Sequence, residues 1–190
     1  LIAYLHLASE SKNFLIVSPR TEIIRKFLAE LQPSHKKYIF VSQALVDYPQ
    51  IYTANSQIAD QTLFSDNSGL NIWVLSPQAF TARNAKIKER NEHSQYSLVE
   101  HLQQLDDLVI FFDESHHLNS DSAEMSVWKE ELSNLKPKFI MGTTASVNEG
   151  DEVNVIYSYD LKKCLNEHKY TKFVNIIPDK KGETIEADDY

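Results

Sequence analysis

This chain has little cysteine, no long apolar run and no visible signal peptide. Each of these absences excludes a class of protein. Cys164 is the one cysteine among 190 residues, so an internal disulfide is excluded and a reducing compartment is expected, with packing as the role of the thiol. No apolar run approaches the roughly 20 residues that a membrane-spanning helix needs, and no signal peptide is visible. We therefore expect a cytoplasmic protein without a membrane partner.

Positive charge is also in short supply. The chain carries 19 Lys and Arg against 27 Asp and Glu, for a formal net charge of −8. This balance argues against a broad basic face, but it leaves room for a narrow nucleic-acid track built from backbone amides and a few side chains. What the chain does have is a hydrophobic content of 42% over 190 residues, enough to bury the core of one globular α/β domain.

The most informative segment is residues 108–117, LVIFFDESHH. Its five apolar residues predict a strand buried on both faces, and Asp113 and Glu114 follow where that strand leaves the sheet. In open α/β sheets, ligands bind beyond the carboxyl ends of the strands. One carboxylate there can hold a hydrated Mg²⁺ while the other polarises a water, which suits nucleotide hydrolysis. The simpler alternative is an acidic cap on the following helix.

A second polar run supports the same site. Residues 143–146, TTAS, follow a short predicted strand at 138–142. The two strands lie about 30 residues apart, a common distance between neighbouring parallel strands joined by one helix. We expect the hydroxyls of this run to reach the two carboxylates and His116. The alternative is that Thr144 and Ser146 only satisfy local backbone groups in a turn.

Strand and helix patterns alternate along the chain, which predicts an α/β fold with a mostly parallel sheet. Residues 1–8, 21–31 and 98–105 have the pattern of helices. Residues 42–69 and 81–97 are polar and less regular, and we expect the second of these to be a solvated loop or an exposed helix. The predicted strands lie at 14–17, 37–41, 72–75, 108–112, 139–141 and 154–157.

Four segments resemble, in order and spacing, the motifs of the first motor domain of superfamily-two helicases of the DExH type. The sequence DESH at 113–116 matches motif II, and TAS at 144–146 resembles motif III. The segments NFLIVSPR at 13–20 and IWVLSPQ at 72–78 resemble motifs Ia and Ib. The general resemblance covers about residues 1–160. Within the superfamily, residues 153–161 are similar to the segment after motif III in the Res (helicase-nuclease) subunits of type III restriction enzymes.

The resemblance implies a RecA-like, three-layer domain of the P-loop NTPase type that contributes to an ATP site. Glu114 would be the catalytic base that orients the attacking water, and Asp113 would bind Mg²⁺, mainly through water. His116 would connect the ATP site to motif III, where Thr144 and Ser146 lie, and to a second RecA-like domain. ATP and Mg²⁺ are the cofactors that this site implies.

The resemblance also implies a nucleic-acid track. Ser18 and Arg20 lie where motif Ia contacts the nucleic-acid backbone, and the forked donors of Arg20 suit a phosphate. Ser76 and Gln78 make a weaker second contact in motif Ib. The alternative for Arg20 is an ion pair with Glu22 or exposure to solvent. DNA is the expected nucleic acid, with RNA left open.

The sequence departs from the family in two ways. The phosphate-binding loop G-x-x-x-x-G-K-[ST] is absent, although residues 1–8 read as the helix that would follow it. A second motor domain with its arginine finger is also absent. We therefore expect a fragment: residues 1–177 as a RecA-like domain truncated at its N-terminus, and 178–190 as a linker toward the second domain. The parent would be an ATPase or helicase of a restriction system, with a modification subunit as a further partner and possible nuclease activity, and the fragment alone would be inactive.

Two other functional classes stay open. A RecA-like module without catalysis would serve as a scaffold, and the missing phosphate loop supports that class. A metal-dependent hydrolase would use Asp113, Glu114, His116 and His117 around Zn²⁺ or a dinuclear centre. Adjacent residues rarely converge on one metal, and the other histidines show no helpful ligand spacing, so the metal-dependent hydrolase is the weaker alternative.

Overall fold

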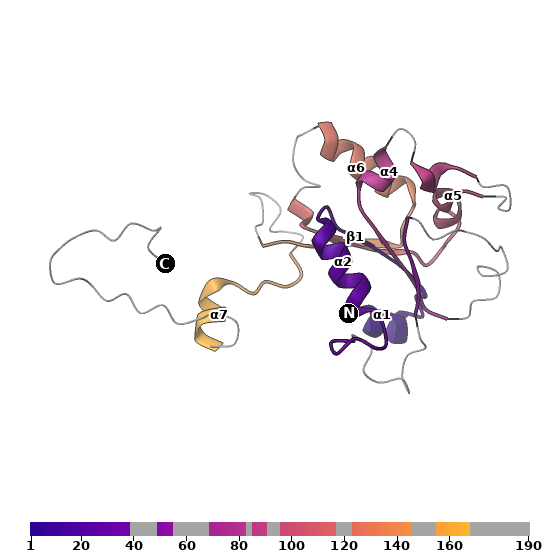
Figure 1. Ribbon diagram of the computed structural model, residues 1–190. Helices are drawn as coiled ribbons and strands as arrows, with labels where there is room; N and C mark the ends of the chain where they lie inside the picture. Colours follow the sequence, from indigo (N-terminus) through magenta and orange to yellow (C-terminus); the bar gives the residue numbers. More distant parts are fainter. Residues whose placement is uncertain are drawn as a thin grey trace. The chain divides into compact units, whose positions relative to one another are not determined.

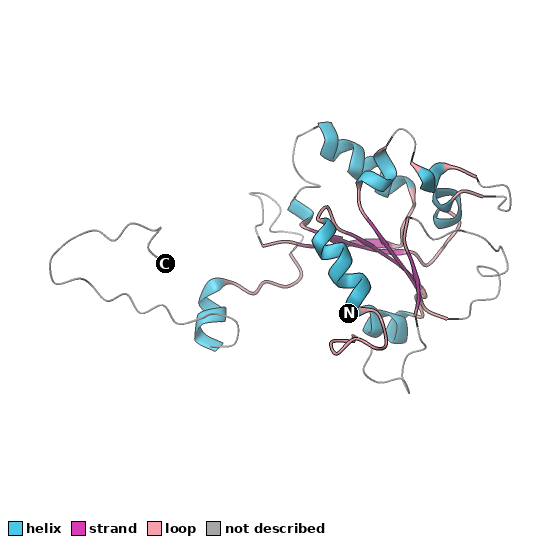
Figure 2. Cartoon of the chain, in the orientation of Figure 1, coloured by secondary structure: helices cyan, strands magenta, loops and turns pink. Residues whose placement is uncertain are grey.

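The apolar runs of the sequence form the centre of a parallel sheet (Figure 1, Figure 2). The computed structural model describes residues 1–38, 49–54, 69–82, 85–90, 96–116, 123–145 and 155–167. The chain divides into two units, 1–149 and 150–190. Among the described residues of the first unit, five strands run in the order β2-β3-β1-β4-β5, and every neighbouring pair is parallel. The strands are β1 (Asn13–Val17), β2 (Gln50–Tyr52), β3 (Asn71–Leu75), β4 (Val109–Asp113) and β5 (Phe139–Thr143).

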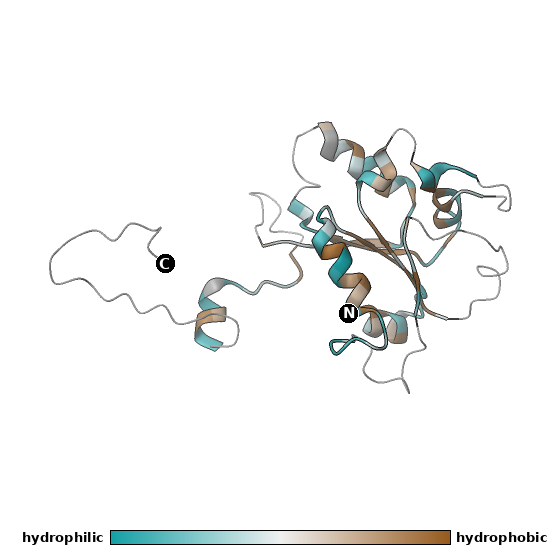
Figure 3. Ribbon diagram, viewed as in Figure 1, coloured by the Kyte–Doolittle hydropathy of each residue, from teal (hydrophilic) through white to brown (hydrophobic). Residues whose placement is uncertain are grey.

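Helices cover both faces of this sheet, which explains why β1 and β3 are apolar without alternation. Helices α1 (Ile2–Ser9) and α2 (Thr21–Glu30) pack against one core cluster, around Phe14 and Ile72. The other face carries a second cluster around Leu15 and Phe112. Figure 1 shows the helices of that second face grouped together, and Figure 3 shows the strands as the hydrophobic centre. These helices are α4 (Gln78–Thr81), α5 (Leu98–Leu102) and α6 (Ala123–Asn134), with the 3-10 helix η1 (Lys86–Lys88).

The handedness of the crossover connections explains which helices lie on which face of the sheet. The connection from β1 to β2 moves toward one edge of the sheet, whereas those from β3 to β4 and from β4 to β5 move toward the other edge. Crossovers between parallel strands are right-handed almost without exception, so opposite directions place the connecting helices on opposite faces. The three-layer α/β arrangement therefore follows from strand order, and the predicted fold class is confirmed.

A polar chain fixes the register of the three central strands at their amino ends. The carboxylate of Asp107 accepts hydrogen bonds from the Lys12 backbone N–H at 2.6 Å and from the Asn13 side-chain amide at 2.5 Å. The Asn13 side-chain oxygen accepts in turn from the Asn71 amide at 3.0 Å. These contacts join the start of β1 to the start of β3 and to Asp107, which lies two residues before β4. Because the amino ends are level, the carboxyl ends of the strands also come level.

Most predicted elements are confirmed within two residues, including the helix at 1–8 and the strands at 14–17, 72–75, 108–112 and 139–141. The helix predicted at 98–105 ends earlier, at Leu102, after a start fixed by a capping box in which Ser97 and Glu100 bond each other's backbone N–H. None of the described helices is long and apolar enough to span a bilayer.

Two predicted strands are wrong where the structure describes them. Lys37 lies in a turn and Tyr38 in irregular backbone, while residues 39–41 lie outside the described part. The edge strand is instead β2, whose three half-buried or exposed residues carry too short an apolar pattern to be recognised. Residues 155–157 are irregular rather than a strand. The segment at 81–97 was expected to be solvated, but Ala85 and Ile87 are buried in the core.

The second unit is described over residues 155–167 and contains α7 (Leu161–Glu167). The Asp160 carboxylate accepts from the Lys163 backbone N–H at 2.7 Å and so caps this helix. The Lys163 ammonium lies 5.1 Å from the ring centre of Tyr157 and 5.5 Å from that of Tyr159. Cys164 is a half-buried free thiol.

Candidate functional site

The carboxyl ends of β1, β4 and β5 converge on Asp113, the last residue of β4. One carboxylate oxygen of Asp113 accepts from the Ser18 hydroxyl at 3.1 Å, and the other accepts from the Thr143 hydroxyl at 3.2 Å. Each hydroxyl comes from the strand on one side of β4, and the register pairs Asp113 with Thr143 directly. The two hydrogen bonds fix the orientation of the carboxylate and leave its remaining lone pairs for a ligand.

Glu114 turns the chain away from the sheet. Its φ angle is 57°, in the left-handed region that non-glycine residues enter at a cost of roughly 1–2 kcal/mol. The backbone of Ser115 and His116 continues in 3-10 conformation. Strain of this size persists only where the surrounding structure holds it in place, and such residues cluster at functional sites.

The partners of the Glu114 carboxylate differ from those of the Asp113 carboxylate. One oxygen lies 3.3 Å from a terminal guanidinium nitrogen of Arg20, and the other lies 3.5 Å from Nδ1 of His116. Nδ1 of His116 is also 2.9 Å from the Thr144 hydroxyl, which follows β5. The imidazole therefore links Glu114 to the end of the neighbouring strand, as an acceptor from Thr144 or as a donor, depending on its tautomer.

A close backbone approach holds the turn against β5. A Cβ atom added to Gly142 would lie 2.5 Å from both Cβ and Oγ of Ser115. Real Cβ atoms do not approach other heavy atoms so closely, so the chain can pass here only because residue 142 is glycine. Gly142 thus sets how near Ser115, and with it Glu114 and His116, can lie to the end of β5.

The structure brings together some of the predicted site residues and separates others. Asp113, Glu114, His116 and Thr144 form one cluster with two further residues, Ser18 and Arg20, that were expected on the nucleic-acid track. Ser18 is completely buried, and its hydroxyl donates to Asp113.

Arg20, the residue expected to contact a nucleic-acid phosphate, has a largely exposed side chain that pairs with Glu114. The alternative expected for Arg20 was an ion pair with Glu22 or exposure to solvent, and the ion pair seen is with Glu114. Ser76 and Gln78 follow β3, on the other side of β1 from β4. Ser146 and His117 lie outside the described residues. The sequence predicts that hydroxyls of residues 143–146 reach the carboxylates, and the Thr143 hydroxyl does donate to Asp113. Sequence reasoning missed Gly142, although a glycine inside a strand pattern is a usable signal for a close approach.

The donor set favours a hydrated Mg²⁺. The Asp113 carboxylate is a hard oxygen donor with two neutral hydroxyls beside it, and Mg²⁺ is typically held by one or two carboxylates, waters and substrate phosphates. Within the part of the chain that the structure describes, no group of three His, Cys, Asp or Glu side chains could hold a metal ion.

A family model described as type III restriction enzyme, res subunit, matches residues 1–149. The chain belongs to this family. The match includes the whole first unit, and so the fold, the acidic cluster and the residues around it. No match to the chain was found among curated proteins or solved structures.

Membership in the res-subunit family makes this chain a RecA-like domain of an ATP-dependent, helicase-like motor. The open parallel sheet agrees with that assignment, because its polar cluster lies beyond the carboxyl ends of central strands, where nucleotides bind in such sheets. The described site is thus in the position expected for the nucleotide of a res-family motor.

Proposed function

We propose that this res-family domain contributes Mg²⁺-dependent ATP hydrolysis to a DNA-acting motor through Asp113 and Glu114. The observation that carries the proposal is that two adjacent carboxylates have separate partners. Asp113 is held by two hydroxyl donors, whereas Glu114 faces a cation and an imidazole. Different surroundings give two carboxyl groups different roles. We assign Asp113 to Mg²⁺ and Glu114 to the proton of the attacking water.

Bound Mg²⁺ would neutralise charge on the β- and γ-phosphates of ATP. Asp113 would hold that cation, mainly through water, with a carboxylate whose orientation is fixed by Ser18 and Thr143. Glu114 orients the attacking water and accepts its proton. His116, held at the Thr144 hydroxyl, ties the position of Glu114 to the end of β5. Donors for the phosphates must come from outside these residues, because the sequence contains no G-x-x-x-x-G-K-[ST] loop.

DNA is the proposed nucleic-acid partner, since the family description is that of a restriction enzyme. Hydrolysis would open and close a cleft between this domain and a second RecA-like domain of the same longer protein. The first domain would include residues 1–177, with 178–190 leading toward the second. A scaffold without catalysis remains the competing proposal.

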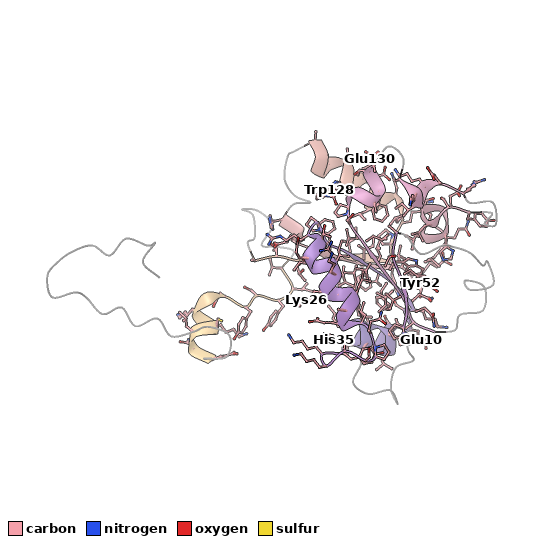
Figure 4. The ribbon with its side chains drawn as sticks, viewed as in Figure 1. Glu10, Lys26, His35, Tyr52, Trp128 and Glu130 are labelled. Atoms are coloured by element: carbon pink, nitrogen blue, oxygen red, sulfur yellow. The ribbon has the colours of Figure 1, made fainter. Side chains whose placement is uncertain are left out.

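The test uses a longer protein that contains this chain together with a phosphate-binding loop. Glu114→Gln should abolish ATP turnover and leave ATP binding nearly unchanged, because the amide keeps the shape but cannot accept a proton. Asp113→Asn should instead weaken Mg²⁺-dependent nucleotide binding. Glu130→Gln is the matched control, because Glu130 is an exposed carboxylate on α6, two residues after Trp128 (Figure 4). Normal turnover in Glu114→Gln would favour the scaffold.

A further inference from the structure

Arg20 is placed to act on Glu114, although the two residues lie far apart in the sequence. Arg20 follows β1 by three residues and comes directly before α2, and its backbone N–H donates to the Ser18 hydroxyl at 3.4 Å. That same hydroxyl donates to Asp113. The loop after β1 is therefore tied to one carboxylate through Ser18, while the Arg20 side chain reaches the other carboxylate at 3.3 Å.

Both carboxylate oxygens of Glu114 have a protein partner in this arrangement, Arg20 on one and His116 on the other. A carboxylate that is to accept a proton from water must turn a lone pair toward that water, and a guanidinium in contact competes for the lone pairs. Of the two contacts, the one with Arg20 is easier to release. The Arg20 side chain is 63% exposed, whereas the His116 side chain is 27% exposed and also contacts Thr144.

We propose that Arg20 is a positioning residue that restrains Glu114 at rest, and that a phosphate of the DNA backbone releases Glu114 by taking the guanidinium. The proposal rests on the role proposed above for Glu114. Its chemistry needs no new group, because a guanidinium binds a phosphate or a carboxylate through the same forked donors. One exposed side chain, contacting the carboxylate through one nitrogen, can then be transferred from a carboxylate to a phosphate.

DNA binding and the Arg20–Glu114 ion pair affect each other reciprocally under this proposal. If DNA must break the Arg20–Glu114 pair, then weakening that pair must strengthen DNA binding by the same factor. An exposed ion pair contributes about 0.2–1 kcal/mol, which corresponds to a factor of about 1.5 to 5 in affinity. Neutralising Glu114 should therefore raise DNA affinity by that factor, provided that Arg20 is present.

The first experiment measures DNA binding without nucleotide in a longer protein that contains this chain. Glu114→Gln should bind DNA about 1.5- to 5-fold more tightly, and the gain should vanish in the Arg20→Ala background. Glu22→Gln controls for the loss of one negative charge near the same loop, because Glu22 lies in the first turn of α2. Arg20→Ala should also flatten the slope of log affinity against log salt by about one unit. An equal gain with and without Arg20, or an unaltered slope, would overturn the proposal.

The second experiment measures ATP turnover with and without DNA. Arg20→Ala should raise the rate without DNA and lower the ratio of the stimulated to the unstimulated rate, whereas Arg20→Lys should restore part of that ratio. Arg25→Ala is the charge-matched control, because Arg25 is an exposed arginine on α2, the helix that follows Arg20. A lower unstimulated rate with an unchanged ratio would refute the restraint and leave Arg20 as an ordinary support for Glu114. Turnover that survives Glu114→Gln would instead refute the function proposed for Glu114, so the two failures are distinguishable.

Discussion

The close approach of Gly142 and Ser115 gives the sharpest test of how the site is held together. In Gly142→Ala, the new methyl carbon would lie 2.5 Å from Cβ and Oγ of Ser115. Carbon atoms in good contact are separated by about 3.5–4.0 Å, so the strand and the turn must move apart by about 1 Å. Neither contacting atom is the end of a long side chain, so rotation cannot relieve the clash. Overpacking of this kind typically costs about 1–3 kcal/mol.

Urea unfolding of this chain measures that cost directly. We expect Gly142→Ala to lower the free energy of unfolding by about 1–3 kcal/mol. Ser115→Gly removes both clashing atoms, so the double variant should recover most of the loss, with a coupling energy of about 0.5–3 kcal/mol. Gly69→Ala is the matched control, because a Cβ at Gly69 would meet nothing within 4 Å.

The same displacement should also lower the rate of ATP turnover. A shift of about 1 Å at a catalytic group can reduce the rate about 100-fold, so Gly142→Ala in an active longer protein should lose turnover and regain it in the Ser115→Gly background. Unfolding of Gly142→Ala at the wild-type urea concentration would refute the close approach. An equal loss with and without Ser115→Gly would show that the damage arises elsewhere than at the turn.

Two further predictions concern parts of the fold that support the site. Asp107→Ala should lower the free energy of unfolding by about 1–3 kcal/mol, because the Lys12 N–H loses its acceptor. Asp106→Ala, at the exposed neighbouring residue, is the control. Equal urea midpoints for the two variants would show that Asp107 does not fix the register of the central strands. Burial beside Trp73 lowers the pKa of His101 from 6.5, so the folded state binds a proton less readily than the unfolded state, and stability should fall as pH drops below about 6.5. His101→Phe should flatten this part of the dependence of the urea midpoint on pH, and an unchanged profile in that variant would assign the dependence to other groups.

The sequence was sufficient for the centre of the fold because the central strands are continuous apolar runs bounded by polar residues. It failed at the edge, where β2 has three residues and no distinctive pattern. The acidic pair and the Thr144–His116 contact could be predicted from strand ends alone. The Arg20–Glu114 and Ser18–Asp113 contacts could not, because they depend on β1 and β4 lying side by side, which strand order along the chain does not reveal.

The position of β1 between β3 and β4 has a consequence for how the protein is made. One neighbour of β1 is complete by residue 75, but the other is not complete until residue 113, with Phe14 paired to Val109. Pairing between such distant segments must overcome the entropy of closing a long loop, so it is intrinsically slow. During synthesis, one edge of β1 therefore waits with its backbone unpaired, which is the condition under which chains aggregate. We expect truncations before residue 109 to be insoluble, and the acidic site to be among the last features to form.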